Sequence, residues 1–186
     1  MKRIFDIVFV LGVAIVVAIP AVLVALAVKL TSPGPILYWS QRIGRGNAQF
    51  SMPKFRTMKI DTPAVASHLL SDPQACLTPI GAFLRRSSLD EIPQLWSILV
   101  GDMSVIGPRP ALYNQYDLIK LRTSKGVSAL VPGLTGWAQV NGRDNISIAK
   151  KVGYDEEYLR RRSLAFDFYI LVLTVKKVCM REDVSH

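Results

Sequence analysis

Two adjacent acidic residues, Asp90 and Glu91, precede Pro93 in the segment SSLDEIPQLWSILVGDMSVIGPRP. Proline is favoured at the first position of a helix, so we expect a helix to begin near Pro93 with the acids at its start. The N–H groups and dipole at such an end favour an anion, such as a carboxylate or a phosphoryl group. Carboxylates can attack phosphorus and can hold Mg²⁺, which makes Asp90 and Glu91 candidates for phosphoryl chemistry. The alternative is that Asp90 or Ser88 only caps the helix.

Basic residues form the second candidate group. Arg109 stands between Pro108 and Pro110, which restrict the backbone on both sides, so its guanidinium loses little freedom on binding phosphate. A single Pro-Arg-Pro is otherwise typical of a surface turn. Exposed basic residues are more often solvated surface than ligands of an anion. The further cations that can surround a diphosphate are Lys54, Arg56, Arg85 and Arg86.

An acid also lies in an apolar stretch near the end of the chain. Asp167 is the one charged residue between Leu164 and Val175, and a buried acid needs a partner or a metal. Pairing with a structural arginine, Arg161 or Arg162, is the equally open alternative.

The segment PGLTGWAQVNGR, residues 132–143, contains three glycines. Glycine allows close backbone approach to a ligand, and Arg143 follows the Asn-Gly turn, so this loop can suit a nucleotide or pyrophosphate. By itself, the segment indicates only a turn-rich loop.

The chain of 186 residues is basic and apolar, with a formal charge of +9, 50% hydrophobic residues and a mean hydropathy of +0.28. Such an excess of positive charge suits nucleic acid, anionic lipid or phosphorylated substrates. The aromatic and basic interleaving typical of RNA binding is absent, so membrane and phosphate are favoured over nucleic acid. Two cysteines without a CxxC pair indicate neither a zinc site nor a disulfide framework, which favours a reducing cytoplasmic setting.

An uncharged run of 22 residues, Ile7 to Val28, is long enough to cross a bilayer. Pro20 removes a backbone hydrogen bond inside this run, so we predict a kink there. Basic residues flank both ends of the run, and the positive-inside rule is best met if both ends stay on the cytoplasmic side. We therefore predict a kinked, re-entrant membrane anchor over residues 1–30, and an ordinary spanning helix is the alternative. The run is longer than the apolar region of a signal peptide, which disfavours cleavage.

Residues 31–186 are predicted to form one compact catalytic domain. The expected fold is α-rich α+β, with a small β-hairpin and amphipathic helices at the membrane interface; Trp96 belongs either to that interface or to the core. Extended pieces at 36–39 and 49–58 flank a Gly-rich turn and predict the hairpin. Helices are expected at 80–87, from Pro93, at 111–125 and at 148–180 with a break near Ser163. A turn is expected at 132–136 and a short strand at 137–140.

Taken together, these segments resemble the bacterial sugar transferase family, the monotopic polyprenyl-phosphate phosphoglycosyl transferases, especially its small members with one membrane element. The resemblance covers nearly the whole chain. The segments that carry it are KRIFDIV, TSPGPILYWSQRIGRG, PKFRTM, RRSSLDEIPQLWSILVGDMSVIGPRP and PGLTGWAQVNGR, in this order.

The resemblance implies transfer of a sugar-1-phosphate from a UDP-sugar to undecaprenyl phosphate with release of UMP, the first membrane step of bacterial glycoconjugate synthesis. It implies Asp90 as the nucleophile, Glu91 as a Mg²⁺ ligand beside Asp90, and a phosphorylated Asp90 intermediate. Lys54, Arg85, Arg109 and Asp167 complete the polar site. The expected location is the cytoplasmic face of the inner membrane, with membrane lipids as partners, no nucleic acid, and a homodimer left open.

Two positions depart from the family pattern: Ile19 precedes Pro20 where relatives often have Ser-Pro, and Val131 stands where relatives have Arg. The first removes a hydroxyl that can cap freed backbone groups, and the second affects phosphate or nucleotide contacts. The rival functional class is a catalytically silent, basic adaptor at the membrane surface. A nucleic-acid-binding protein would show affinity that falls steeply with salt and does not depend on Mg²⁺.

Overall fold

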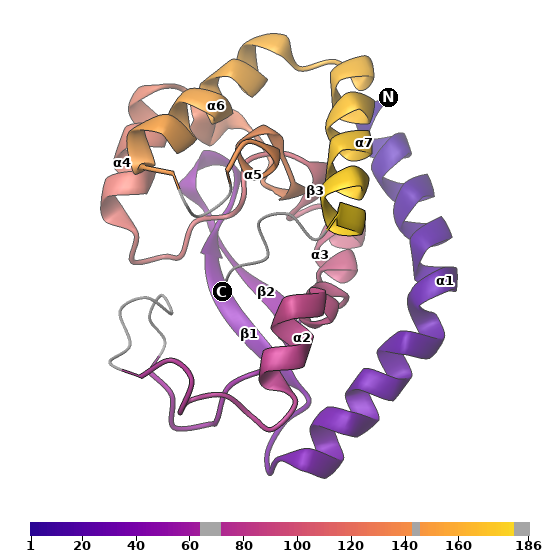
Figure 1. Ribbon diagram of the computed structural model, residues 1–186. Coiled ribbons are helices and arrows are strands. Elements are labelled where there is room, and N and C mark those ends of the chain that lie inside the picture. Colours follow the sequence, from indigo (N-terminus) through magenta and orange to yellow (C-terminus); the bar gives the residue numbers. More distant parts are fainter. Residues whose placement is uncertain (64–71, 143–145, 181–186) are drawn as a thin grey trace.

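The computed structural model describes residues 1–63, 72–142 and 146–180. A long N-terminal helix, α1 (Lys2–Thr31), lies along one side of a globular body built from the rest of the chain (Figure 1). The body contains two small sheets and several short helices. The predicted α-rich α+β class with a small β-hairpin is confirmed.

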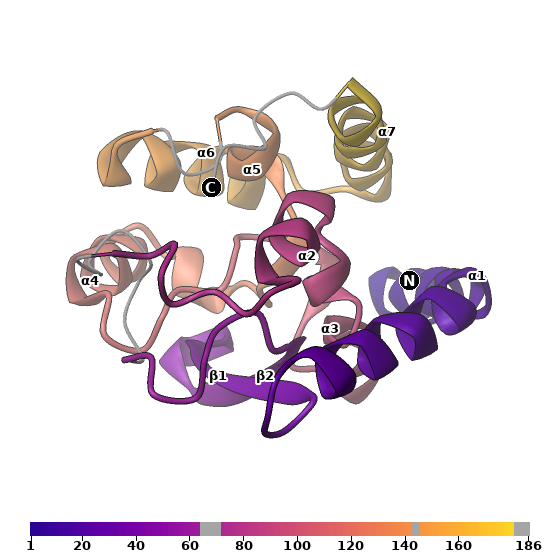
Figure 2. The same cartoon turned by 60° about the horizontal axis from the view of Figure 1, so that its bottom comes forward.

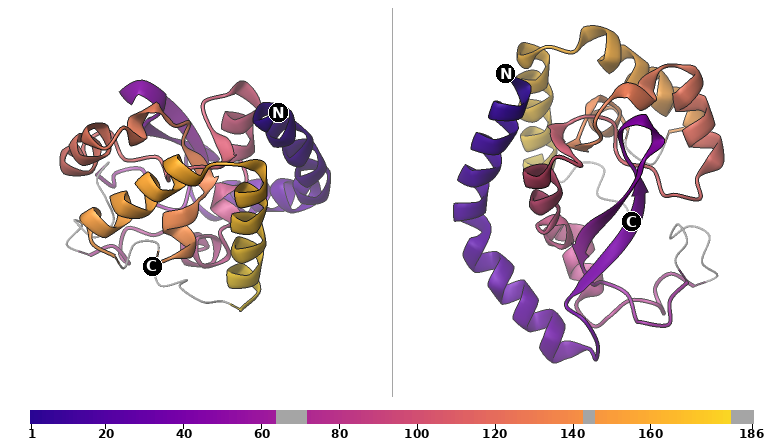
Figure 3. Two further views of the ribbon diagram at one scale, coloured as in Figure 1. Left: turned by 90° about the horizontal axis from the view of Figure 1, so that it is seen from above. Right: turned by 180° about the vertical axis from the view of Figure 1, so that it is seen from behind.

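Helix α1 is unbroken across Pro20, and its axis bends part-way along, as the front and back views both show (Figures 1 and 3). It is long and apolar enough to cross a membrane by length and composition. Much of its apolar surface faces outward, and Ile15, Val16 and Ile19 are each more than 70% exposed. The re-entrant course of this helix through a bilayer stays a prediction.

Polar contacts tie the N-terminal turns of α1 to the body. Lys2 Nζ lies 2.7 Å from Asp167 Oδ2, and Arg3 donates to the carbonyls of Ile98 and Leu99. Asp6 is buried and accepts hydrogen bonds from Ser104 Oγ and Val105 N. Because the other end of α1 runs directly into the first strand, both ends of the helix are held by the same body.

The first sheet is an antiparallel hairpin of β1 (Leu37–Ile43) and β2 (Gln49–Phe55), as predicted, joined by the turn η1 (Arg45–Asn47). Gly46 and Asn47 both have positive φ values in this turn, a conformation that these residues adopt most readily. Strand β1 is longer than the sequence pattern indicated, and the pairing runs from Leu37 opposite Phe55 to Ile43 opposite Gln49.

The second sheet corrects two predictions. Strand β3 (Ser104–Ile106) pairs in parallel with β4 (Gly133–Thr135), so the expected turn at 132–136 is largely strand. The expected strand at 137–140 is instead a short helix, α5 (Trp137–Val140). The glycines serve backbone packing, because a Cβ on Gly133 would lie only 2.1 Å from the nitrogen of Gly107. Close approach of two chain segments therefore explains a composition that looks like a turn.

One helix of the body begins later than expected. The predicted helix at 111–125 begins only at α4 (Tyr116–Ser124), because Ala111 accepts a backbone hydrogen bond from Ile43 and is drawn onto the hairpin. The break near Ser163 is confirmed. The other helical elements are α2 (Gly81–Ser87), η3 (Leu89–Glu91), α3 (Gln94–Val100), η4 (Val127–Ala129), α6 (Ile148–Arg161) and α7 (Leu164–Met180).

The main core lies where α1, α3, β3, α6 and α7 meet, and Figure 2 shows α7 and α1 standing on the same side of the body. Ile98, Ile106 and Ile170 are completely buried there. Trp96 is 59% exposed and therefore is not a core residue; its placement at a membrane interface stays a prediction.

Candidate functional site

Asp90 and Glu91 lie in a tight turn between two helices. Ser88 ends α2 with a positive φ of 55°, and the chain then makes the single turn η3 before α3 begins after Pro93. The acids therefore precede the helix start instead of forming its first turn. This turn packs against β2, and Asp90 is 7% exposed. The local fold thus places two adjacent carboxyl groups at the end of the hairpin.

Two cations from distant segments meet these acids. Lys54, near the end of β2, places Nζ 2.9 Å from Glu91 Oε1 and 3.6 Å from Asp90 Oδ2. Arg109, from the Pro-Arg-Pro segment after β3, places Nη2 3.0 Å from the same Glu91 oxygen. The structure therefore brings together four of the predicted site residues in one cluster.

The two acids differ electrostatically although they are neighbours in sequence. Burial raises the pKa of Asp90, the charge of Lys54 opposes this effect, and the adjacent Glu91 adds to it. Burial acts on Glu91 in the same direction, but the charges and hydrogen bonds of Lys54 and Arg109 outweigh it and hold the pKa of Glu91 well below its usual range. Glu91 is thus a fixed anion that anchors two cations. Such a division between paired carboxyl groups is typical of sites where they have different roles.

Arg85, Arg86 and Arg56 occupy three different environments. Arg85 donates from Nε to Thr57 Oγ1 at 3.1 Å, and burial lowers its pKa while the charge of Asp90 opposes this. Its charge therefore acts on Asp90. Arg86, the next residue of α2, is exposed.

Arg56 is only 5% exposed and is bonded to the connection between α1 and β1. Its Nε donates to the carbonyl of Pro35 at 2.7 Å, and Nη2 donates to Ser32 Oγ at 2.9 Å. These contacts give Arg56 a place in the fold at the end of α1, and its role in binding phosphate stays a prediction.

Asp167 has different partners from those expected. Its Oδ2 is paired with Lys2, and its Oδ1 accepts from the Tyr158 hydroxyl at 2.7 Å. Burial, together with this hydrogen bond, raises the pKa of Tyr158. Arg161, one of the two arginines proposed to pair with Asp167, instead bonds Glu157. Pairing with Arg161 is therefore not what the structure shows, and through Lys2 Asp167 joins α7 to the start of α1.

Arg143 lies outside the described residues. The loop that leads to it is described as far as residue 142.

A comparison with protein families is decisive for identity. The model of the family described as "Bacterial sugar transferase" matches residues 1–181. The chain belongs to the bacterial sugar transferase family. The resemblance drawn from its motifs is therefore confirmed.

Three similar relatives of this sugar transferase differ in length. The UDP-glucose:undecaprenyl-phosphate glucose-1-phosphate transferase of Escherichia coli K12 is 38% identical over 95% of this chain and 40% of its own length. The uncharacterized sugar transferase EpsL of Bacillus subtilis is 37% identical over 100% of this chain and 90% of its own length. The exopolysaccharide production protein ExoY of Rhizobium meliloti is 37% identical over 96% of this chain and 85% of its own length. The chain thus spans about two fifths of the first of these relatives and most of the other two.

The acid pair of this sugar transferase fits a magnesium ion that is shared with a substrate. Among the described residues, no three His, Cys, Asp or Glu side chains come together as a metal-binding group. In phosphate sites, Mg²⁺ is commonly held by one or two carboxylates and takes its other ligands from substrate phosphates and water. Adjacent carboxyl groups at Asp90 and Glu91 suit that mode of binding, and they do not suit a closed metal site made by protein alone.

Two parts of the site escaped sequence reasoning. Gln94 is 2% exposed, lies four residues after Asp90, and its Nε2 has no acceptor among the described residues. Arg122 and Asp155 form a buried ion pair behind the Pro-Arg-Pro segment, with Arg122 Nη2 2.7 Å from Asp155 Oδ2. The signal for Gln94 is an amide one turn after a catalytic candidate, on the buried face of α3. Arg122 gives no such signal, because it is one of several basic residues in its segment.

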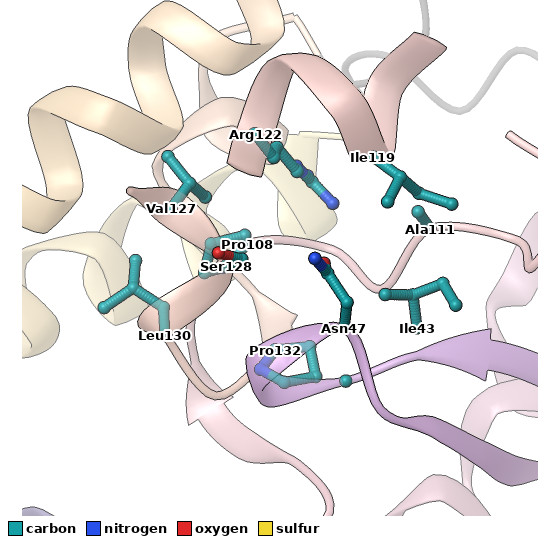
Figure 4. A pocket seen from close by; sticks show the side chains of 11 residues that line it. Ile43, Asn47, Pro108, Ala111, Ile119, Arg122, Val127, Ser128, Leu130 and Pro132 are labelled. Atoms are coloured by element: carbon teal, nitrogen blue, oxygen red, sulfur yellow. The ribbon is translucent and has the colours of Figure 1, made fainter. Parts of the chain in front are cut away.

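A pocket opens between the hairpin turn and α4 (Figure 4). Asn47 and Arg122 reach into it from these two elements. Apolar side chains, including Ile43, Ile119 and Val127, make up much of its lining. Neither Asp90 nor Glu91 lines this pocket, so it is a neighbour of the acid cluster and not its binding cleft.

Proposed function

We propose that this sugar transferase is an enzyme that transfers a sugar-1-phosphate from a UDP-sugar to undecaprenyl phosphate and releases UMP. The observation that carries the proposal is the cluster in which Lys54 and Arg109 both pair with Glu91 beside the buried Asp90. The activity named for the relative from Escherichia coli supports the same class of substrates. The exopolysaccharide production protein of Rhizobium meliloti supports a role in polysaccharide synthesis.

The reaction proceeds in two displacements at one phosphorus atom. A carboxylate oxygen of Asp90 attacks the phosphorus that bears the sugar, the bond to the bridging diphosphate oxygen breaks, and UMP leaves with that electron pair. An oxygen of undecaprenyl phosphate then attacks the phosphorus of the phosphosugar-aspartate and releases the Asp90 carboxylate. The lipid keeps both phosphates and the sugar.

Charge at the site favours this course. Lys54, Arg109 and Arg85 supply three cations against the two carboxylates of Asp90 and Glu91. Fixed cations stabilise the charge that develops on the transferred and leaving phosphate oxygens, which is the main task in phosphoryl transfer. Glu91 holds two of the cations in place, and Asp90 stays available as the nucleophile. Mg²⁺, held by Glu91 and Asp90, would neutralise charge on the diphosphate.

The membrane arrangement follows from the two ends of α1. Lys2 and Asp6 tie the start of the helix to the body that its other end enters as β1. We therefore infer a re-entrant anchor whose ends both lie on the cytoplasmic face of the bacterial inner membrane. Exposed apolar residues of α7, including Phe168 and Val172, and Trp96 of α3 then lie at the interface with lipid. An active site at that surface meets a water-soluble nucleotide sugar and a lipid phosphate together.

The test is UMP release from a panel of UDP-sugars by protein in nanodiscs with undecaprenyl phosphate and Mg²⁺. Wild type should release UMP from one sugar, and Asp90→Asn should lower the rate by at least about a thousandfold, since it removes the nucleophile. Asp102→Asn is the matched control, because Asp102 is an exposed acid on a nearby loop. Without the lipid acceptor, wild type incubated with the active sugar should gain the mass of one phosphosugar.

Equal rates in wild type and Asp90→Asn would remove Asp90 from the nucleophile's role. Absence of release across a broad panel would favour the silent adaptor.

A further inference from the structure

All three carbonyl groups of the Pro-Arg-Pro segment accept hydrogen bonds. Proline has no N–H, so Pro108 and Pro110 cannot donate, and hydrogen bonds that fix their positions must be accepted by carbonyl oxygens. Each of the three consecutive carbonyls has a donor from a different part of the chain. The bonds are Gly133 N to Pro108 O at 2.9 Å, Arg122 Nη1 to Arg109 O at 2.8 Å and Arg42 Nη1 to Pro110 O at 3.2 Å.

The donor to the central carbonyl is a buried charge with its own counterion. Arg122 of α4 is 8% exposed, and its Nε and Nη2 donate to Asp155 Oδ2 of α6 at 2.9 and 2.7 Å. The carboxylate fixes the plane of the guanidinium, so that the remaining arm, Nη1, points at Arg109 O. A buried ion pair adds little net stability compared with well-packed apolar side chains. Its clear structural result here is a fixed position for the Arg109 backbone.

Arg109 links this buried pair to the acid cluster. Its carbonyl accepts from Arg122 on one side, and its guanidinium reaches Glu91 on the other, with Nη2 3.0 Å from Oε1. We propose that Arg122, oriented by Asp155, is a positioning residue that sets the Arg109 guanidinium for the transferred phosphate. This inference rests on the proposed function in so far as Arg109 contacts the diphosphate. A displacement of about 1 Å in such a group can lower the rate about a hundredfold.

The discriminating variant is Arg122→Lys. Lysine keeps the positive charge for Asp155, but one ammonium group cannot reproduce two bonds to the carboxylate and a third to a carbonyl on the opposite side. The matched control is Lys125→Gln, which removes an exposed ion pair across the same two helical segments. Lys125 Nζ lies 3.5 Å from Glu156 Oε2, and no contact with the Pro-Arg-Pro segment is recorded for it among the described residues.

The first measurement is hydrogen exchange in peptides that begin before Gly107 and cover residues 107–111. In this range the amide hydrogens belong to Gly107, Arg109 and Ala111, and Gly107 N is bonded to Thr135 O at 2.9 Å. In full-length protein held in nanodiscs, Arg122→Lys should speed exchange there about tenfold or more, and Lys125→Gln should leave it unchanged. This measurement does not depend on turnover. Unchanged exchange in Arg122→Lys would overturn the positioning role, whether or not the protein releases UMP from a UDP-sugar.

The second measurement is a double-mutant cycle on UMP release. Arg122→Lys should lower kcat/KM by about tenfold to a hundredfold in the wild-type background and have little effect in Arg109→Gln. Equal losses in both backgrounds would overturn the inference, because Arg122 would then act independently of Arg109. A wild type that releases no UMP would instead count against the proposed function, and the exchange measurement would still decide the positioning role.

Discussion

Replacing Asp6 with alanine should detach the start of α1 from the body. Asp6 is 3% exposed and accepts from Ser104 Oγ at 2.9 Å and from Val105 N at 3.0 Å. Ser104 and Val105 are themselves 2% and 1% exposed, so water cannot readily replace the lost acceptor. Each buried donor left without a partner costs about 1–3 kcal/mol, which gives about 2–6 kcal/mol for the two donors. Removing a buried carboxylate offsets part of this cost, so we expect a net loss of about 2–4 kcal/mol.

Thermal unfolding in nanodiscs, followed by tryptophan fluorescence, measures this loss. For a chain of this size, about 1 kcal/mol corresponds to about 2–4 °C, so Asp6→Ala should lower Tm by about 4–16 °C. The control is Asp6→Ala combined with Ser104→Ala, which removes the orphaned hydroxyl and should recover about 1–3 kcal/mol. A Tm within 2 °C of wild type, or no recovery in the double variant, would refute the assigned contacts.

Two further predictions concern buried and titrating groups of the body. Gln94→Leu keeps the side-chain volume and removes the buried Nε2, which has no acceptor among the described residues. It should therefore raise the free energy of unfolding by about 1–3 kcal/mol. A lower Tm than wild type would show that the amide is hydrogen-bonded in the folded protein. Glu157 accepts from Trp137 Nε1 at 2.7 Å, and this bond, with Arg161, lowers the pKa of Glu157 although burial opposes it. Because the folded pKa is depressed, the ionised group stabilises the fold above the unfolded value of about 4.3, and this stability is lost as the pH falls through the folded pKa. Glu157→Gln should therefore lower Tm at pH 7, and the difference in Tm from wild type should shrink toward about pH 3. An equal difference in Tm at both pH values would count against the hydrogen bond between Trp137 and the ionised Glu157.

Local patterns were sufficient to predict the hairpin and the break near Ser163, because strand alternation, turn residues and helix-breaking positions act over a few residues. The pairing of β3 with β4 was missed because it joins segments separated by the whole of α4 and by loops. Its glycines had been interpreted as turn formers. Close packing against a strand that is distant in sequence requires glycine, and so does a turn. Sequence reasoning alone therefore does not separate the two.

Prediction of the acid cluster from sequence had the same limit. Asp90, Glu91 and Arg109 were evident from their types and from the neighbouring prolines. The sharing of Glu91 between Lys54 and Arg109 depends on how the end of the hairpin meets the Pro-Arg-Pro segment. The partners of Asp167 were missed because the nearest arginines in sequence were considered, whereas Lys2 is 165 residues away. The partners of a buried charge depend on which segments meet in the tertiary structure. The periodicity of the sequence does not predict those meetings.

The contacts that hold α1 also set an order for biosynthesis. Asp6 is separated from its hydrogen-bond donor Ser104 by 98 residues, which a ribosome adds in about 5–20 s at the usual rate of about 5–20 residues per second. Lys2 waits longer, until Asp167 has been made. During that interval the apolar helix has emerged but the body that holds it does not yet exist. Lipid or a chaperone must therefore cover the apolar surface of the helix first. Docking of its charged end onto the body is then a late step in the folding of the protein.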